Sequence, residues 1–388
     1  MHRCDHSGFA YEYYIERMNY MKRICPVLLV LCLMAGAALP AGAAARDVGD
    51  LNVRDPFVLV HDGAYYMYGT GLAAGPGYGC YVSTDLQSWE GPYQVWSPPE
   101  GHPAAGDFWA PEVHAYQGKF YLFAAYNNGL HRGSSIFRAE SPLGPFEEIT
   151  PGFFTPSGSF CIDSTLYVDA QGQPWVCWGD ERYRDDGSRF MSALVYAKLK
   201  PDLTGLAGAP EVLLWPEVVP HNKNGALIEA PFFWRGKDGT LFLVYSGYSH
   251  GYNVCVARSE SGEITGPWKV HRILYESTNP FPEDGGHGML FTDLEGQLRL
   301  GLHIPNNWGD FGKERARFLP VEDKGYMLFT IGAQRFHGIG LFSRVRAADW
   351  MDEGLQSDSW FARFCYQALY CLLLPMKAVR LFCRGETI

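Results

Sequence analysis

Basic residues are scarce in this chain of 388 residues. Its 32 Lys and Arg stand against 42 Asp and Glu, which gives a net charge of −10. Binding to a nucleic-acid backbone needs a concentrated basic surface, because phosphates must be neutralised along the contact. The charge balance therefore argues against nucleic acid as the main partner.

Metal-binding cysteine motifs are also missing. The chain has ten cysteines, yet it contains no CxxC motif and no Cys/His pair at the spacing of a metal site. Four cysteines lie inside apolar, strand-like runs in the body of the chain: Cys80, Cys161, Cys177 and Cys255. We expect buried free thiols at these positions, with a disulfide as the alternative.

Long helical and membrane-spanning patterns are rare. Near the C-terminus an uncharged apolar run covers residues 364–376, and it ends with Pro375 and Lys377. Its 13 residues are too few for a helix to cross a bilayer. We expect no stable membrane span, and we predict that residues 330–388 form a tail that folding and activity do not need.

The N-terminus has the pattern of an export signal. Met21-Lys22-Arg23 is followed by an apolar run to Leu39 and by the small residues Ala43-Ala44-Ala45. This order of basic, apolar and small residues predicts a signal peptide over residues 21–45 and a secreted or periplasmic protein. A polar leader rarely precedes such a signal, so residues 1–20 are interpreted as a mis-assigned start.

Aromatic residues make up 15% of the chain, and hydrophobic residues make up 47%. The hydrophobic share is enough to bury a substantial core. Aromatic side chains pack well on pleated sheets, and their rings stack on the apolar faces of sugars. The composition therefore favours an all-β protein and is compatible with carbohydrate binding.

One pattern recurs five times along the chain: a polar residue, an apolar strand, a turn that contains glycine, and a second, aromatic-rich strand. The second strands begin near Tyr65, Phe120, Trp175, Leu241 and Leu298, at intervals of 55, 55, 66 and 57 residues. Further strand-like runs lie between these hairpins. Repeats of about four strands are typical of the blades of a propeller. The sequence predicts an all-β, five-bladed β-propeller over residues 46–329, with a β-sandwich as the alternative.

The first residue of each copy is polar: Asp55, Glu112, Asp163, Glu229 and His287. The innermost strand of every blade runs along the central axis, so equivalent positions there converge on one pocket. Carboxylates that lie close together repel, and one is then expected to keep its proton while another stays ionised. Glycoside hydrolysis uses such a pair, one as the acid on the leaving oxygen and one on water or sugar.

Each acid also has a structural interpretation. Asp55 could bond its own turn, Glu112 could brace the loop that contains Trp109, and Glu229 could cap the turn before Pro231. The shared register favours a catalytic function for Asp55, Asp163 and Glu229, whereas Glu112 is interpreted as a support or a substrate contact. Trp109 is a candidate sugar platform or a packing residue between blades.

Five motifs, in order, resemble those of glycoside hydrolase family 43. They are Arg54-Asp55-Pro56-Phe57, Phe108-Trp109-Ala110-Pro111-Glu112-Val113, Cys161-Ile162-Asp163, Ile228-Glu229-Ala230-Pro231 and Gly286-His287-Gly288. The resemblance covers about residues 50–327. It implies a five-bladed propeller that acts by inversion, chiefly on glycans that contain arabinose or xylose.

The resemblance also implies a function for single residues. Asp55 would be the general base, Glu229 the general acid, and Asp163 the group that raises the pKa of Glu229 and orients it. His287 would match an axial histidine that, in many members, lies beside a water or a bound calcium. Arg317 would match a late arginine that faces the site, with Arg315 as an equal candidate.

We therefore expect an exported O-glycosyl hydrolase of the α-L-arabinofuranosidase or β-xylosidase type, with an oligosaccharide or polysaccharide as its partner. No cofactor is expected to be required, although a structural calcium at His287 is an option. Exo-galactanase or endo-arabinanase action, a retaining mechanism and a non-catalytic carbohydrate-binding propeller are the alternatives. Carboxyl groups roughly 6.5–9.5 Å apart would favour inversion, and about 5–5.5 Å would favour retention.

Overall fold

The computed structural model describes residues 45–156, 160–183, 190–216, 227–248, 251–276, 283–307 and 311–330. The expected leader and signal over residues 1–45, and the expected tail over residues 330–388, therefore lie almost wholly outside the described residues. Within the part that is described, no helix is long and apolar enough to cross a membrane.

Five antiparallel sheets make up the described residues, and each sheet is one blade. Blade 1 contains β1 (Arg46–Asp47), β2 (Arg54–His61), β3 (Ala64–Thr70), β4 (Tyr78–Ser83) and β5 (Ser88–Trp96). Blade 2 contains β6 (Gly106–Tyr116), β7 (Lys119–Asn127), β8 (Arg132–Ala139) and β9 (Glu147–Glu148). Blade 3 contains β10 (Phe160–Val168), β11 (Pro174–Tyr183), β12 (Phe190–Lys198) and β13 (Glu211–Leu214). Blade 4 contains β14 (Glu229–Arg235), β15 (Leu241–Tyr248), β16 (Tyr252–Ser259) and β17 (Trp268–Tyr275). Blade 5 contains β18 (Gly286–Thr292), β19 (Leu298–Ile304), β20 (Arg315–Asp323) and β21 (Leu328–Thr330).

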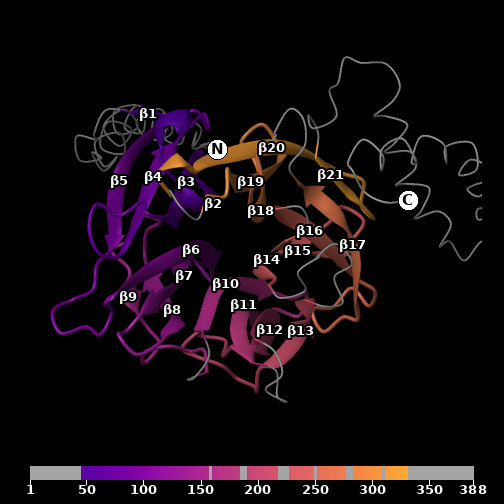
Figure 1. Cartoon of the computed structure of the whole chain (residues 1–388), viewed down its shortest axis with the longest axis horizontal. Coiled ribbons are helices and arrows are strands. Elements are labelled where there is room, and N and C mark those ends of the chain that lie inside the picture. Colours follow the sequence, from indigo (N-terminus) through magenta and orange to yellow (C-terminus); the bar gives the residue numbers. More distant parts are fainter. Residues whose placement is uncertain are drawn as a thin grey trace, which may run out of the picture. The chain divides into compact units, whose positions relative to one another are not determined.

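The blades are arranged in a ring around the five innermost strands (Figure 1). Strand β2 contacts β6, β6 contacts β10, β10 contacts β14, β14 contacts β18, and β18 contacts β2. Two short 3₁₀ helices are also described, η1 (Val48–Asp50) and η3 (Phe311–Lys313). The prediction of an all-β, five-bladed β-propeller is therefore confirmed.

Hairpin turns set the register of the inner strands. In the turn between β2 and β3, Asp62 and Gly63 both have positive φ, and Gln117 and Gly118 repeat this between β6 and β7. Two consecutive residues with positive φ form the turn whose twist matches that of the flanking strands. These turns were expected from the sequence, and they set the pairing of β2 with β3 and of β6 with β7.

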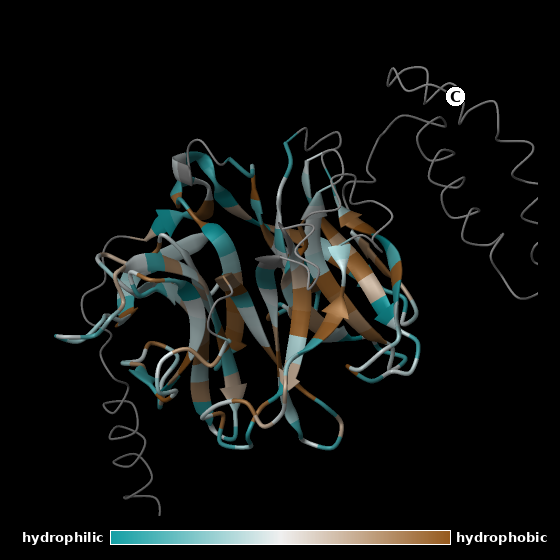
Figure 2. Ribbon diagram, turned by 60° about the horizontal axis from the view of Figure 1, so that its bottom comes forward, coloured by the Kyte–Doolittle hydropathy of each residue, from teal (hydrophilic) through white to brown (hydrophobic). Residues whose placement is uncertain are grey.

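Hydrophobic residues are frequent along the strands, which carry brown segments in Figure 2. Their side chains form buried clusters within and between the sheets. Large rings such as Trp89, Trp178 and Tyr245 are fully buried there. The four body cysteines are buried and free, which confirms that prediction: Cys80, Cys161, Cys177 and Cys255. The core thus holds the five inner strands in fixed positions around the axis.

Candidate active site

Every innermost strand carries a β-bulge in its N-terminal part, and β6 carries an additional one at Asp107-Phe108. In each, two residues oppose a single residue of the second strand. The bulged pairs are Asp55-Pro56, Ala110-Pro111, Asp163-Ser164, Ala230-Pro231 and His287-Gly288. A bulge bends the strand and re-aims side chains, so all five strands change direction at the same level of the ring.

The first residue of each bulge adopts the left-handed region. The φ angles are 52° at Asp55, 44° at Ala110, 58° at Asp163, 53° at Ala230 and 55° at His287. Asp and His tolerate this region better than most residues, whereas alanine is uncommon in it. The conformation is held by the surrounding blades.

The positions of the bulges correct the way in which the five sequence repeats were matched to one another. Asp55, Asp163 and His287 do occupy equivalent positions. Glu229 lies one residue before its bulge, and Glu112 lies two residues after the equivalent alanine, Ala110. The prediction that all five polar residues are equivalent is therefore wrong, because the bulge inserts an extra residue that the hydrophobic pattern does not reveal.

In most bulges, the backbone N–H of the first residue donates a hydrogen bond to a side chain of the preceding blade. The Ala110 N–H donates to Thr70 Oγ1 at 2.8 Å, and the His287 N–H donates to Ser246 Oγ at 2.7 Å. The Asp55 N–H donates to His303 Nδ1 at 3.2 Å. Blade 3 has Gly179 at the corresponding place, and there the carboxylate of Asp163 accepts from the Ala230 N–H at 3.0 Å. Asp163 therefore fixes the backbone beside Glu229.

Asp55 is held as a carboxylate. Its Oδ1 lies 3.1 Å from His287 Nδ1 and 3.6 Å from Arg54 Nε, and its Oδ2 accepts from Thr70 Oγ1 at 2.7 Å. Burial alone would raise the pKa of Asp55, but the charges of His287 and Arg54 outweigh it and hold that pKa well below its usual range. Asp55 is thus ionised at neutral pH.

Arg54 does reach Asp55, although strand alternation predicts that neighbouring residues point to opposite faces. The bulge at Asp55 interrupts that alternation. Arg54 Nη1 also donates to Glu314 Oε1 at 2.6 Å, and the Glu314 side chain is fully buried. Arg54 therefore forms an ion pair with Asp55.

Glu229 has the opposite environment. Burial, and then the negative charge of Asp163, raise the pKa of Glu229 to about 8, although Tyr252 and His287 act in the other direction. Burial, followed by the charge of Asp55, also raises the pKa of Asp163 above its ordinary value, against the effect of His287. Glu229 therefore keeps its proton at neutral pH, while Asp55 does not.

His287 lies between the two aspartates, with Nδ1 at 3.1 Å from Asp55 and 3.9 Å from Asp163. Burial would lower its pKa, but the charges of Asp55 and Asp163 raise it to about 9. Among the described residues, no three His, Cys, Asp or Glu side chains form a group that could hold a metal. These residues do not fit a directly coordinated ion, and a water-mediated calcium at His287 stays a prediction.

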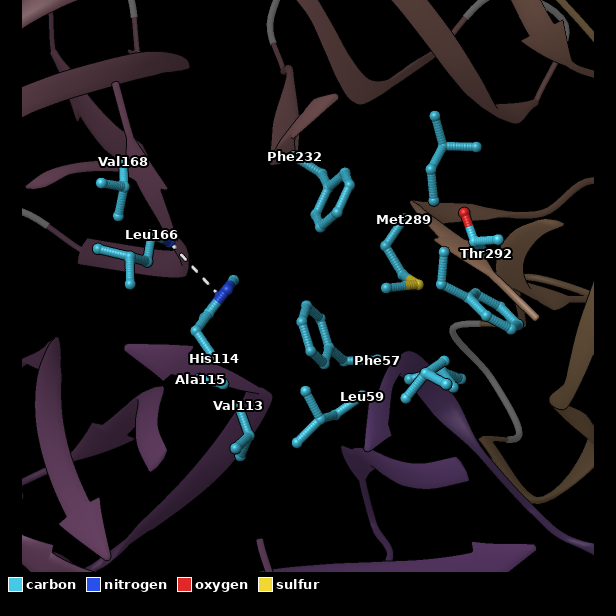
Figure 3. A pocket seen from close by; sticks show the side chains of 14 residues that line it. Phe57, Leu59, Val113, His114, Ala115, Leu166, Val168, Phe232, Met289 and Thr292 are labelled. Carbon is cyan, nitrogen blue, oxygen red and sulfur yellow. Dashed lines mark hydrogen bonds between the residues drawn. The ribbon is translucent and has the colours of Figure 1, made fainter. Parts of the chain in front are cut away.

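Glu112 is buried and lies on β6 directly after the Ala110-Pro111 bulge. Its Oε2 is 2.9 Å from His114 Nε2, and its negative charge acts on both Asp163 and His287. His114 lines an apolar cavity of about 390 Å³ together with Phe57 and Phe232 (Figure 3). Glu112 is thus buried and paired with His114, and its role as a support or as a substrate contact stays a prediction.

The predicted substrate contacts of Trp109 and Arg317 stay untested. Arg132 lies over the Trp109 ring, with 4.4 Å between the guanidinium carbon and the ring centroid. Arg317 Nη1 donates to Ala316 O, and Arg315 donates to Gly49 O. Within the part of the chain that the structure describes, Arg315 and Arg317 make no hydrogen bond or ion pair with Asp55, Asp163 or Glu229.

Sequence reasoning missed four residues that shape the site: Thr70, Tyr252, His303 and Glu314. The sequence did contain a signal for Thr70 and His303. Both residues, like Ser246, lie five positions after the start of a second strand, at Tyr65, Leu298 and Leu241 respectively. Tyr252 and Glu314 lie on other strands or loops, and no repeat marks them. Burial lowers the pKa of His303 to about 3, so it is neutral and accepts the Asp55 N–H.

Comparison with known proteins agrees with this geometry. Residues 46–319 match the family described as glycosyl hydrolases family 43. The chain is 24% identical to an extracellular exo-alpha-(1->5)-L-arabinofuranosidase, ArbA, of Cellvibrio japonicus, over 76% of this chain and 84% of that protein. It is 26% identical to an extracellular endo-alpha-(1->5)-L-arabinanase of Bacillus subtilis, over 66% of this chain and 77% of that protein.

A solved structure, an endo-arabinase from Bacteroides thetaiotaomicron, is 31% identical and superposes with a TM-score of 0.63. The match covers 73% of this chain and 98% of that one. The prediction of a glycosyl hydrolase is therefore confirmed, and the chain belongs to glycosyl hydrolases family 43.

Proposed function

We propose that this protein is an exported glycosidase that removes terminal arabinose or xylose residues from plant-type polysaccharides or oligosaccharides by single-displacement inversion. The observation that carries the proposal is that two carboxyl groups of one site differ in protonation at neutral pH. Asp55 is held ionised by His287 and Arg54, whereas burial and Asp163 keep Glu229 protonated. An acid and a base with separated pKa values are what glycoside hydrolysis requires.

The reaction uses both groups in one step. Asp55 takes a proton from a water molecule as the water oxygen forms a bond to the anomeric carbon. Glu229 gives its proton to the glycosidic oxygen as the bond between that oxygen and the anomeric carbon breaks. The leaving sugar departs as an alcohol, and the anomeric configuration is inverted. Each proton transfer is of the kind that contributes roughly 10²- to 10⁴-fold to the rate.

Asp163 is a positioning residue in this mechanism. Its carboxylate accepts from the Ala230 N–H at 3.0 Å, which holds the backbone next to Glu229. Its negative charge is the second-largest reason for the raised pKa of Glu229. Asp163 therefore keeps the acid both oriented and protonated.

The sugar is proposed from the relatives. Their names specify alpha-(1->5)-L-arabinofuranosidase and arabinanase activities, and one more distant relative is named a putative beta-xylosidase. Endo-arabinanase action is the second candidate, because the B. subtilis relative and the B. thetaiotaomicron structure carry that type of name. Export is supported by the expected signal peptide and by relatives that are named extracellular.

A substrate panel tests the proposal. Nitrophenyl arabinoside, xyloside and galactoside are incubated with the protein, and the anomeric configuration of the first product is followed by NMR. We expect arabinoside or xyloside hydrolysis with inversion. Retention would overturn the single-displacement step, galactoside-only hydrolysis would overturn the sugar, and binding without any hydrolysis would favour a carbohydrate-binding propeller.

A further inference from the structure

Tyr252, the first residue of β16, belongs to the same blade as the proposed acid. The register of this blade places Glu229 opposite Ser246, and Ser246 opposite Val254 on β16. Residues that lie directly opposite each other, or two apart along one strand, project from the same face of a sheet. Tyr252 lies two residues before Val254, so its side chain projects from the same face of blade 4 as Glu229.

Contacts with blade 5 fix the ring of Tyr252. The ring stacks on that of His303, with 5.7 Å between the centroids and 26° between the planes. It also lies against the backbone of Gly286, where an added Cβ would be 2.3 Å from Cε1 of the ring. The Tyr252 N–H donates to Asp284 Oδ2 at 3.0 Å, and its carbonyl accepts from the Gly285 N–H at 3.2 Å. The fold thus holds both the backbone and the ring of this tyrosine in place.

The hydroxyl of Tyr252 is buried and makes no hydrogen bond to any residue that the structure describes. The whole residue is only 1% exposed. A buried hydroxyl without a partner lowers stability, so its presence needs an explanation. Burial, and then the negative charge of Glu229, raise the pKa of Tyr252 well above its ordinary value. The hydroxyl therefore keeps its proton and stays able to donate a hydrogen bond.

The effect of Tyr252 on Glu229 indicates where that hydrogen bond can go. Burial, and then the charge of Asp163, raise the pKa of Glu229. The largest effect that lowers this pKa comes from Tyr252, ahead of His287 and Arg54. An O–H group lowers the pKa of a carboxyl group by donating to its ionised form. His287 and Arg54 are paired with the proposed base, whereas the hydroxyl has no such partner.

The need for a donor at Glu229 changes during the reaction. Titratable groups from several strands face Glu229, Tyr252 or both: Asp163 on β10, Asp55 and Arg54 on β2, His287 on β18 and Tyr248 on β15. His303, which stacks on Tyr252, is neutral because burial lowers its pKa to about 3. When Glu229 gives up its proton, a second negative charge forms in a buried place beside Asp163. A hydrogen bond to that charge stabilises it.

We infer that the Tyr252 hydroxyl is a hydrogen-bond donor for the carboxylate that Glu229 becomes when it protonates the leaving oxygen. The tyrosine keeps its own proton throughout, so it is a positioning residue that acts through Glu229. Its effect on the reaction rests on the proposed function, because Glu229 must be the acid.

Tyr252→Phe removes the hydroxyl and keeps the ring. Two substrates of the sugar that the panel identifies are compared: a nitrophenyl glycoside, whose leaving group needs little protonation, and a disaccharide, whose leaving oxygen must be protonated. We expect kcat/KM for the disaccharide to fall roughly tenfold, whereas kcat/KM for the nitrophenyl glycoside changes little.

Tyr245→Phe is the matched control. Tyr245 is also fully buried in blade 4, and its hydroxyl likewise lacks a hydrogen-bond partner among the described residues. It lies one residue before Ser246, so its side chain projects from the opposite face of the sheet. This variant should keep the wild-type ratio of the two kcat/KM values.

The pH profile separates a donor from a ring that only packs. Because the hydroxyl favours the ionised form of Glu229, its removal should raise the pKa of Glu229 and move the alkaline limb of kcat/KM to higher pH. Loss of packing would lower activity without extending it to higher pH. A shift of the acidic limb alone would mean that the hydroxyl acts on Asp55, and it would overturn the inference.

NMR of isotope-labelled glutamate carboxyl groups separates this inference from the proposed function. The signal of Glu229, assigned with Glu229→Gln, is titrated in the wild type and in Tyr252→Phe. A higher pKa in the variant supports the donor even if neither protein hydrolyses a glycoside, an outcome that would overturn the proposed function alone. An unchanged pKa, or an unchanged ratio of the two kcat/KM values in an active enzyme, would overturn the inference and leave the proposed function standing.

Discussion

Three carboxylates in one site have different protonation because each has different neighbours. Asp55 has a cationic imidazole and a guanidinium within 3.6 Å. Glu229 is buried next to a second negative charge, that of Asp163, and among the described residues no cation forms a comparably close ion pair with it. The difference between base and acid thus comes from the residues around each carboxyl group.

Replacement of the proposed base tests its function directly. In Asp55→Asn, the side chain keeps its size and can still bond Thr70, but it cannot accept a proton from water. We expect kcat to fall by about 10²- to 10⁴-fold, with the affinity for a product sugar within a few-fold of wild type. Steady-state kinetics and calorimetry measure the two effects, and unchanged hydrolysis would refute Asp55 as the base.

The pH profile reports the proposed acid. Because Glu229 must carry a proton, kcat/KM should decrease as pH rises through the raised pKa of Glu229, about 8. In Asp163→Asn, the negative charge that helps to raise this pKa is gone, so the alkaline limb should move to lower pH. A limb that stays in place would show that Asp163 does not act on Glu229 through its charge.

At the scale of the strands, the bulges explain what the sequence could and could not predict. Alternating apolar residues and turns with glycine predicted the hairpins correctly, because both signals are local. The bulges at Asp55 and Ala230 leave no such signal, since they depend on amide bonds to the preceding blade. The acids could therefore be named from the sequence, whereas their register and the contact of Arg54 with Asp55 could not.

Gly286, the first residue of β18, is expected to be essential for the shape of the site. A Cβ at this position would lie 2.3 Å from Cε1 of Tyr252, the ring that stacks on His303 and lies beside Glu229. Gly286→Ala should therefore displace Tyr252 and lower kcat at least tenfold. Overpacking of this kind also costs typically 1–3 kcal/mol in the free energy of unfolding.

Gly301→Ala in the same sheet is the matched control. Its Cβ would meet Met289 Sδ at 3.4 Å, and a methionine side chain can move aside. Kinetic assays and thermal unfolding of both variants are compared. Equal activity of the two variants would contradict the inference that Gly286 makes room for Tyr252.

At the scale of the molecule, the contact between blade 5 and blade 1 closes the ring. Val53 N–H donates to Glu314 O at 3.0 Å, and Arg54 pairs with the buried Glu314 carboxylate. Loss of one partner of a buried pair is costly because a charge is left uncompensated. We expect Glu314→Ala to lower the free energy of unfolding by roughly 3 kcal/mol, and denaturant unfolding measures it. Glu140→Ala, which removes an exposed surface ion pair, is the control. If Glu314→Ala lowers the free energy of unfolding by less than this control does, the closure of the ring does not depend on Glu314.

The site also makes the whole molecule less stable than it could be at neutral pH. In the unfolded chain Glu229 releases its proton near its ordinary pKa of 4.5, whereas in the folded protein it keeps the proton up to a pKa of about 8. Between these values the folded state binds more protons, so this carboxyl group lowers the free energy of unfolding as pH rises. Below the lower value the penalty is absent, and above the higher one it is complete.

Glu229→Gln removes this titration. The free energy of unfolding of the variant, relative to the wild type, should therefore increase between pH 5 and pH 8, by on the order of a few kcal/mol. Denaturant unfolding at several pH values measures the difference, and Glu140→Gln, at an exposed side chain, is the control that should run parallel to the wild type. A difference for Glu229→Gln that stayed constant with pH would mean that the folded protein does not hold a proton on Glu229, and the proposed acid would lose its physical basis. A difference that grows with pH would show that the stability lost at this site and the proton needed for catalysis have the same cause.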